Sequence, residues 1–145
     1  MLEDMSNKSL NILFVASWYP STSAPNEGSY VQEQARLLLN GGHKVTVIHP
    51  YMLGNFIDNA FKKSIISRVV DEGLDEIRVG VAPLLPGFRV LSYKRCFRVV
   101  LKTLESMGIS VEAFDIIHSH SALLGGYIGQ QLANRHNLPL VHTEH

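Results

Sequence analysis

Short runs of consecutive apolar residues alternate with helical patterns along this chain. Ile12–Ala16 and Val45–Ile48 are two such runs, and apolar residues recur at helical spacing over Tyr30–Asn40 between them. A continuous apolar run is typical of a strand that is buried on both faces. Gly41 and Gly42 follow the helical pattern, and glycine ends helices because it accepts a left-handed backbone. Strand, helix and strand in succession predict two parallel strands joined by a right-handed crossover.

The same alternation continues to the last residue of the sequence. The second strand is expected to end at His49-Pro50. The further expected elements are a helix within Phe56–Val70, a strand at Glu76–Val81, a helix at Tyr93–Met107, a strand at Phe114–His118, a helix at Leu123–His136 and a strand at Leu140–Thr143. This pattern predicts an α/β fold, a Rossmann-like open parallel sheet with helices on both faces. We expect one domain over residues 1–145, with residues 1–10 disordered.

Composition excludes several classes of protein. Thirteen basic and thirteen acidic residues balance, whereas a nucleic-acid-binding domain is expected to be basic, so no nucleic acid partner is predicted. No apolar run approaches the ~20 residues that span a bilayer, and the polar start MLEDMSNKSLN is not a signal peptide. The single cysteine, Cys96, rules out an internal disulfide. We therefore expect a cytoplasmic protein.

Polar and aromatic residues follow three of the predicted strands at the point where each strand ends. Because the carboxyl ends of parallel strands meet at one edge, and ligands bind there where strand order reverses, we expect these side chains to surround one crevice. They are Trp18, Tyr19, Gly28, His118, His120, Ser121, Glu144 and His145.

Three familiar chemistries do not fit this set. Four histidines would suffice for zinc, but no HExxH or cysteine pair is present, so no metal site is expected. Serine catalysis lacks a GxSxG elbow, and Ser119 and Ser121 have histidines beside them only in sequence. A dinucleotide site lacks GxGxxG. We expect structural hydrogen bonds for His118 and His142, and the other imidazoles to contact sugar hydroxyls or phosphate oxygens.

Two segments, ILFVASWYPSTSAPNEGSYVQEQARLLLNGGHKVTVI and FDIIHSHSALLGGYIGQQLANRHNLPLVHTEH, resemble the N-terminal domain of GT-B glycosyltransferases of family 4, also called group 1. The likeness spans roughly residues 11–49 and 114–145. It implies a retaining transfer of sugar from a nucleotide-sugar, UDP- or GDP-linked, to a glycan or lipid-linked acceptor. It also implies an acceptor-side role for this domain, with a C-terminal donor-binding domain outside these 145 residues and no bound cofactor in the chain itself.

The resemblance also implies roles for individual residues. Gly28 and Ser29 correspond to the loop that approaches the donor phosphates, and His145 to the histidine that lies against the transferred sugar. His145 would hold the sugar and support charge separation, without a covalent step. The acceptor side would be lined by His120, Ser121, Glu144, Trp18 and Tyr19.

Basic residues recur on the predicted Tyr93–Met107 helix. Lys94, Arg98 and Lys102 are four residues apart and therefore share one face. Two interpretations remain open: a solvated helix face, or a dock for anionic lipid headgroups or a phosphorylated acceptor, with peripheral contact to a membrane.

Two functions follow from the sequence. The first is the acceptor-binding part of a glycosyltransferase, inactive as an isolated chain. The alternative is a stand-alone Rossmann-like module that binds carbohydrate or an anion without catalysis. A reading frame that continues past His145 into a second α/β domain would favour the first, and a stop codon the second.

Overall fold

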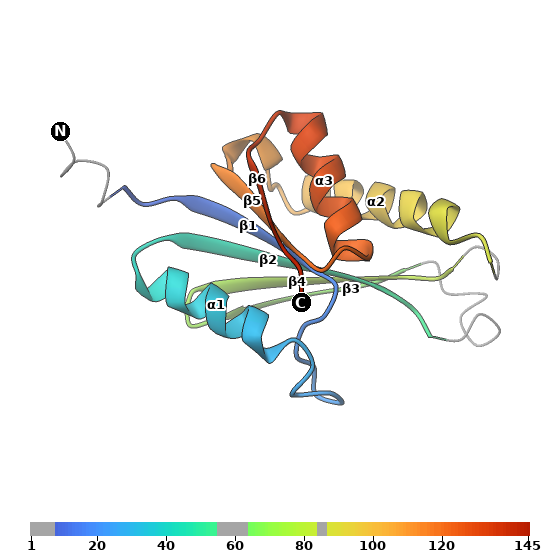
Figure 1. The fold of residues 1–145 in the computed structure, drawn as a ribbon, viewed down its shortest axis with the longest axis horizontal. Coiled ribbons are helices and arrows are strands. Elements are labelled where there is room, and N and C mark those ends of the chain that lie inside the picture. Colours follow the sequence, from blue (N-terminus) through green and yellow to red (C-terminus); the bar gives the residue numbers. More distant parts are fainter. Residues whose placement is uncertain (1–7, 55–63, 84–86) are drawn as a thin grey trace.

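The computed structural model describes residues 8–54, 64–83 and 87–145, and in these a six-stranded sheet is covered by helices on both faces. The strand order is β3-β4-β2-β1-β5-β6. The helix α1 covers one face, and α2 and α3 cover the other (Figure 1). The elements are β1 (Asn11–Ala16), α1 (Ser29–Asn40), β2 (Lys44–Met52), β3 (Ser64–Asp71), β4 (Leu74–Val81), α2 (Arg89–Ser106), a short 3-10 helix η1 (Val111–Ala113), β5 (Ile116–His120), α3 (Leu124–His136) and β6 (Leu140–Thr143).

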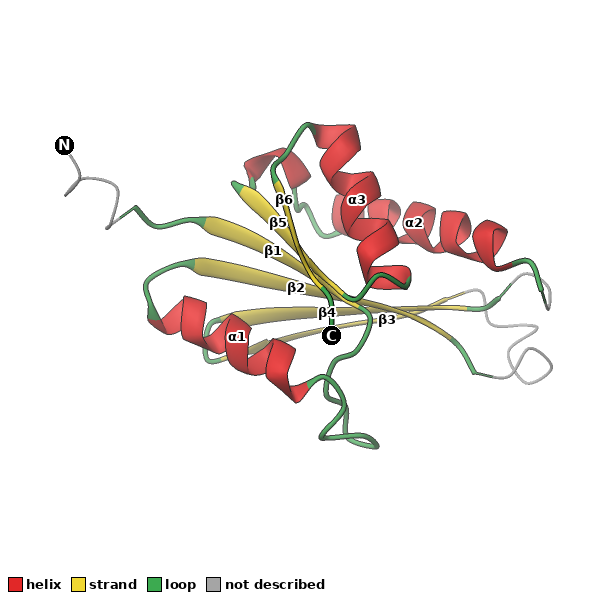
Figure 2. Cartoon of the chain, viewed as in Figure 1, coloured by secondary structure: helices red, strands yellow, loops and turns green. Residues whose placement is uncertain are grey.

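Two hydrophobic cores explain why the strands are apolar along their whole length. Leu13 and Val15 of β1 face α2 and α3, whereas Phe14 and Ala16 face α1. Successive side chains of a strand point to opposite faces, so a strand between two helical layers needs apolar residues at every position. The prediction of an α/β, Rossmann-like sheet is confirmed, as is the crossover from β1 through α1 to a parallel β2 (Figure 2).

The second strand is longer than the sequence predicts, and the expected end at His49-Pro50 is wrong. β2 continues through Pro50 to Met52. Its pairing with β1 stops at Ile48, and from there it pairs only with β4. Proline has no N–H to donate, but at Pro50 the β1 side of the strand no longer requires a partner, so the strand tolerates it as an edge strand would.

The prediction of a helix within Phe56–Val70 is wrong for Ser64–Val70, which belong to the strand β3; residues 56–63 lie outside the described residues. β3 runs antiparallel to β4, so the sheet is mixed rather than wholly parallel. Glu72 and Gly73 join the two strands with φ of 50° and 88°. Positive φ at both positions is what a two-residue type I′ hairpin turn requires.

The remaining boundaries differ from the sequence predictions by a few residues. α2 begins about one turn earlier than Tyr93, and β5 extends two residues past His118 to His120. Most of the segment 1–10 lies outside the described residues, and its residue Leu10 pairs through its carbonyl oxygen with the N–H of Lys44. In the described part of the chain, no helix combines the length and apolar character needed to cross a membrane.

Candidate active site

The strand order reverses between β1 and β5, two neighbouring parallel strands of the sheet. β1 leads through α1 to β2 on one side, whereas β5 and β6 lie on the other. Ala16 at the end of β1 pairs with His120 at the end of β5. This carboxyl edge is where open α/β sheets bind their ligands, and most of the residues predicted to be functional lie along it.

Three histidines meet beside the first turn of α1, and we call them the histidine cluster: His118, His120 and His145. The rings of His118 and His120 stack with centroids 4.2 Å apart on the face of the sheet that Phe14 shares. Nδ1 of His120 lies 3.2 Å from Nε2 of His145. The His145 ring also contacts Tyr30, with centroids 4.3 Å apart. The cluster thus joins β5, the residue after β6, and α1.

Burial keeps the inner part of this cluster uncharged. His120 is only 1% exposed, and its burial, together with the neighbouring histidines, lowers its pKa to about 3. Burial and then the charges of His142 and His145 lower the pKa of His118. His118 is held by a 2.8 Å hydrogen bond between its Nε2 and Oγ1 of Thr143. Near neutral pH His120 is therefore a neutral imidazole, and the lowered pKa of His118 favours its neutral form as well.

Gly28 places the N-terminus of α1 directly against the loop that follows β1. It has φ of 66°, and a Cβ atom added there would lie 2.3 Å from the carbonyl oxygen of Trp18. Glycine is therefore required at this position both by the backbone conformation and by the close approach. The first turn of α1 contains no acidic residue and, within the described chain, no side chain caps it. Gly28 and Ser29 thus lie at a helix terminus whose dipole favours an anion.

A cleft of about 550 Å³ opens at the ends of β1, β2 and β4, and we call it the aromatic cleft. Tyr51 stacks on His49 there, with ring centroids 5.2 Å apart and planes 16° from parallel. The side chains that line it include Trp18, Tyr19, His49, Tyr51, Arg78 and Tyr93. Sugar-sized ligands bind in clefts of this kind, where aromatic rings supply area and a few polar groups fix orientation.

The buried carboxylate of Glu76 organises one wall of the aromatic cleft. It accepts hydrogen bonds from Tyr19 Oη at 2.6 Å and from Gln32 Nε2 at 3.1 Å. Arg78 lies 3.9 Å from the second carboxylate oxygen and 5.3 Å from the centre of the Tyr19 ring. Burial, and then Glu76, raise the pKa of Tyr19, which stays protonated and donates. The Tyr19 hydroxyl is thus already engaged, and Arg78 brings a positive charge to the cleft.

His49 is a further neutral imidazole in the aromatic cleft. Its Nδ1 donates to the carbonyl oxygen of Ala16 at 2.9 Å, and its burial lowers its pKa to about 4. Because Nδ1 carries the proton, Nε2 is the acceptor nitrogen of the neutral ring. The sequence places His49 directly after the apolar run of β2, so its position at the carboxyl edge was the signal that could have identified it.

His142 does not face the histidine cluster but forms a hydrogen-bonded chain on the other face of the sheet. Its Nδ1 lies 2.8 Å from Ser119 Oγ and its Nε2 lies 3.2 Å from Glu144 Oε2. The prediction that Ser119 has a histidine beside it only in sequence is therefore wrong. Ser119 is fully buried, so its hydroxyl serves to hold β6 against β5 rather than to attack a substrate.

Ser121 lies at a backbone corner at the end of β5. It is 1% exposed and has φ of 69°, and its N–H donates to the carbonyl oxygen of Thr143 at 2.9 Å. Its contacts fix the turn between β5 and α3 and the end of β6. Glu144 is exposed and points to His142.

The residues predicted to surround one crevice are divided into two groups. Trp18 and Tyr19 line the aromatic cleft, whereas His118, His120 and His145 form the histidine cluster. Four residues of the aromatic cleft that sequence reasoning missed are His49, Tyr51, Arg78 and Tyr93. Arg78 and Tyr93 belong to no recognisable sequence motif. Arg78 reaches the cleft because β4 pairs with β2, and Tyr93 reaches it because α2 packs across the sheet.

Several histidines lie at this edge, and histidine is a common metal ligand. Among residues 8–54, 64–83 and 87–145, no three His, Cys, Asp or Glu side chains are placed to hold a metal ion. The rings of His120 and His145 are 4° from parallel, with centroids 5.5 Å apart. Nδ1 of His120 and Nε2 of His145 face each other at 3.2 Å, a hydrogen-bonding distance, so each nitrogen is directed at the other rather than at a metal ion.

Comparison with known proteins identifies the family of this chain. A family profile described as Glycosyltransferase Family 4 matches residues 28–145, which include Gly28, the histidine cluster and α2. A protein of Bacillus subtilis (strain 168) with the name "Putative teichuronic acid biosynthesis glycosyltransferase TuaC" is 28% identical over 144 residues. The alignment covers 94% of this chain and 36% of that relative, so the chain spans about a third of the relative's length. The chain belongs to glycosyltransferase family 4.

Proposed function

We propose that this chain forms the acceptor-side half of a retaining glycosyltransferase that moves a sugar from a nucleotide-sugar to a glycan or lipid-linked acceptor. The observation that carries the proposal is the arrangement at the carboxyl edge, where the aromatic cleft and the histidine cluster lie on either side of the loop after β1. A transferase has to bring two substrates together at one such edge. The retaining course and the nucleotide-sugar donor are what membership of the family leads us to expect.

The aromatic cleft is the proposed acceptor site. Trp18, Tyr51 and Tyr93 are half-buried rings, and such rings bind the apolar faces of sugars while leaving hydroxyls to polar neighbours. Arg78 supplies a fixed charge and N–H donors, one of which already binds the carbonyl oxygen of Pro20. Tyr19 holds Glu76, and through it the position of Arg78, rather than contacting the acceptor with its engaged hydroxyl.

The histidine cluster and the N-terminus of α1 are the proposed donor side. Gly28 and Ser29 present a helix terminus to the departing diphosphate. His145 would hold the transferred sugar and stabilise the charge that develops as the bond to the diphosphate breaks. His120 is too buried to contact the sugar, and we assign it a positioning role through its hydrogen bond to His145.

The remaining contacts to the donor would come from residues outside this sequence. The chain spans 36% of its Bacillus subtilis relative, and we propose that the base of the nucleotide is bound by the remainder of such a longer protein. We therefore expect the 145 residues alone to bind nucleotide-sugars weakly and to transfer nothing. Calorimetry that finds micromolar affinity for a UDP- or GDP-sugar, or turnover by the isolated chain, would contradict this part of the proposal.

The test of the whole proposal uses the full-length protein with a panel of UDP- and GDP-linked sugars. His145→Ala is expected to lower kcat about a hundredfold or more, a loss typical of a group that stabilises transition-state charge. Trp18→Ala is expected to raise KM for the acceptor and leave KM for the donor unchanged. The control is His136→Ala at the far end of α3, which removes a histidine that contacts Glu112 away from this edge. An unchanged kcat in His145→Ala would remove that residue from the mechanism.

A further inference from the structure

The carboxyl ends of β2 and β4 carry polar side chains on the face of the sheet that α1 covers elsewhere. Val47 of β2 and Leu74 of β4 lie in the core beneath α1. Because the side chains of a strand alternate between faces, His49 and Tyr51 follow on the same face of β2, and Arg78 on that of β4. The polar part of this face coincides with the wall of the aromatic cleft. The opposite face remains apolar over the same length, with Ile48, Ile77, Val79 and Val81 in the core beneath α2 and α3.

The ring of His49 is fixed in one orientation. Its Nδ1 donates to the carbonyl oxygen of Ala16 at 2.9 Å, and Tyr51 stacks on it with ring planes 16° from parallel. Tyr51 in turn lies across Gly80 of β4, where an added Cβ atom would be 2.6 Å from Cζ of the tyrosine ring. Glycine at this position leaves room for that ring. A hydrogen bond and a packed aromatic ring thus hold the imidazole in place.

Nε2 of His49 is open to the aromatic cleft. Within residues 8–54, 64–83 and 87–145 the imidazole makes one hydrogen bond, which uses Nδ1. The buried side-chain polar atoms that lack a partner in that part of the chain are Nε2 of His120 and Nε2 of His136, so Nε2 of His49 is not enclosed. Burial lowers the pKa of His49 to about 4, and the ring is therefore neutral near neutral pH. Nε2 then carries a lone pair and accepts hydrogen bonds.

Arg78 lies beside His49 on the neighbouring strand and has the opposite hydrogen-bonding character. The two residues are partners in the register of β2 and β4, and both line the aromatic cleft. The guanidinium is held by the carbonyl oxygen of Pro20, by Glu76 at 3.9 Å and by the ring of Tyr19 at 5.3 Å. A guanidinium has five N–H donors and no acceptor, so donors remain for a ligand. A neutral acceptor and a cationic donor thus lie side by side.

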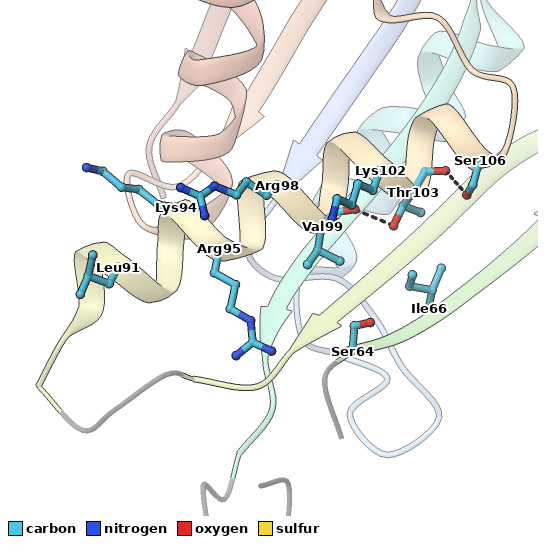
Figure 3. A pocket seen from close by; sticks show the side chains of 10 residues that line it. All are labelled: Ser64, Ile66, Leu91, Lys94, Arg95, Arg98, Val99, Lys102, Thr103 and Ser106. Carbon is cyan, nitrogen blue, oxygen red and sulfur yellow. Dashed lines mark hydrogen bonds between the residues drawn. The ribbon is translucent and has the colours of Figure 1, made fainter. Parts of the chain in front are cut away.

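A groove between α2 and β3, on another part of the molecule, has a different lining (Figure 3). Cations line it, among them Lys94, Arg98 and Lys102, but no histidine or aromatic ring does so in the described chain. The hydroxyls of Thr103 and Ser106 donate to backbone carbonyl oxygens of α2. That groove therefore lacks the combination of aromatic surface, neutral acceptor and cation that the aromatic cleft provides.

A hydroxyl group is the chemical group that suits His49 and Arg78 together. It can donate its proton to His49 and accept from Arg78 at the same time. An ammonium group could donate to His49 but would be repelled by Arg78, and a carboxylate could accept from Arg78 but has no proton for His49. An ether oxygen accepts and cannot donate. Sugars present hydroxyls next to an apolar ring face, which the aromatic side chains of the cleft can cover.

We propose that Nε2 of His49 accepts a hydrogen bond from one hydroxyl of the acceptor sugar, that Arg78 donates to that hydroxyl, and that the pair selects acceptors in which it is free. This role rests on the proposed use of the aromatic cleft as the acceptor site. The hydroxyl keeps its proton in this hydrogen bond, so His49 binds and orients the acceptor without acting as a base. A site that pairs with a hydroxyl rejects analogues that lack it, because its own polar groups are then left unpaired.

The first test follows the histidine nitrogens directly. Full-length protein labelled with 15N-histidine is titrated with the methyl glycosides of glucose, galactose, mannose and N-acetylglucosamine, and the ring nitrogens are followed by NMR. The signal of Nε2 of His49, assigned by its absence in His49→Asn, is expected to move toward the position of a protonated nitrogen with at least one of the sugars. No movement with any of them would overturn the proposal. A movement without sugar transfer would contradict the proposed function and support this role of His49.

The second test uses a sugar that the full-length protein accepts in transfer. His49→Asn keeps an amide N–H near the position of Nδ1 and removes Nε2. It is expected to raise KM for the acceptor about tenfold and to leave KM for the donor unchanged, because a hydrogen bond to the acceptor is lost. With acceptor analogues that each lack one hydroxyl, the variant should show no further loss at one position only, the hydroxyl that His49 binds.

The matched control makes the same substitution next to the amino end of β2. Nδ1 of His43 accepts from the N–H of Leu10 at 3.1 Å, and the amide oxygen of asparagine can replace it. His43→Asn is therefore expected to leave both KM values unchanged. Transfer with an unchanged acceptor KM in His49→Asn would overturn the proposal and leave the proposed function intact. Equal losses at every hydroxyl, or an equal rise of KM in His43→Asn, would also overturn it.

Discussion

His120 and His145 meet at the carboxyl edge of the sheet, with Nδ1 of His120 3.2 Å from Nε2 of His145 and the two ring planes 4° from parallel. Nε2 of His120 is buried and has no hydrogen-bond partner among the described residues. A positive charge on His120 would be shielded from solvent, because the residue is only 1% exposed. The pair therefore depends on His120 being neutral, and this has a consequence for stability.

We expect the stability of the protein to fall with pH below about 6.5, and His120 to account for part of that fall. Its folded pKa of about 3 lies below the ordinary value of 6.5, so the unfolded state binds the proton first. The contribution is present above 6.5 and is lost as pH falls toward 3, at up to about 1.4 kcal/mol per pH unit. Urea unfolding over a series of pH values should show a shallower dependence in His120→Gln. Parallel curves for wild type and variant would contradict the assignment.

Gly28→Ala should destabilise the fold far more than Gly108→Ala. The two glycines have nearly the same φ, 66° and 70°, so both substitutions carry a similar backbone cost of about 1 kcal/mol. A Cβ atom at Gly28 meets the Trp18 carbonyl oxygen at 2.3 Å, whereas one at Gly108 meets nothing within 4 Å. We expect a further loss of about 2 kcal/mol or more at Gly28. Chemical denaturation measures both, and equal losses would show that the loop gives way freely.

Tyr19→Phe should cost about 1–3 kcal/mol although it removes only one oxygen atom. That hydroxyl donates at 2.6 Å to Glu76, a carboxylate that is buried in the wall of the aromatic cleft. Losing the donor leaves a buried acceptor less well satisfied. A double-mutant cycle with Glu76→Gln isolates the interaction, because the loss should shrink when the charge is already gone. Additive losses would place the effect of Tyr19 elsewhere.

Cys96 should resist alkylation in the folded protein. It is the single cysteine of the chain, it is fully buried on the face of α2 that packs against the sheet, and burial raises the pKa of its thiol to about 12. Only the thiolate reacts with iodoacetamide, so labelling should require unfolding and should accelerate in urea along the unfolding transition. Rapid labelling in buffer alone would show that α2 opens locally from the sheet.

Element type could be predicted from the sequence wherever a strand is covered on both faces. The run Ile12–Ala16 predicts a doubly buried strand because every position must be apolar, and the structure buries Ile12 through Ala16. The predicted helix over Leu123–His136 agrees with α3 to within one residue, and the predicted strand Leu140–Thr143 agrees with β6, although β6 is an exposed edge strand. A continuous apolar run indicates a strand that is covered on both faces, and such a run can be recognised from a few consecutive residues.

β3 was misjudged because its pattern fits two structures. Ile65, Ile66, Val69 and Val70 recur at spacings that also suit a helix, although β-branched residues favour strands. Pairing with β4 through the turn at Glu72 and Gly73 decided the matter. Few side chains of an edge strand are buried, so its apolar pattern distinguishes a strand from a helix less clearly.

The sequence alone determined the α/β class, the resemblance to family 4, and the gathering of histidines at one edge of the sheet, since these depend on which residues end each strand. Only the tertiary structure decided that Trp18 and His120 belong to separate groups, that Ser119 bonds to His142, and that Arg78 enters the aromatic cleft. A strand-end position predicts the edge at which a side chain lies. The face it points to and the partners it meets depend on strand order, register and helix packing, which join residues that are far apart in the chain.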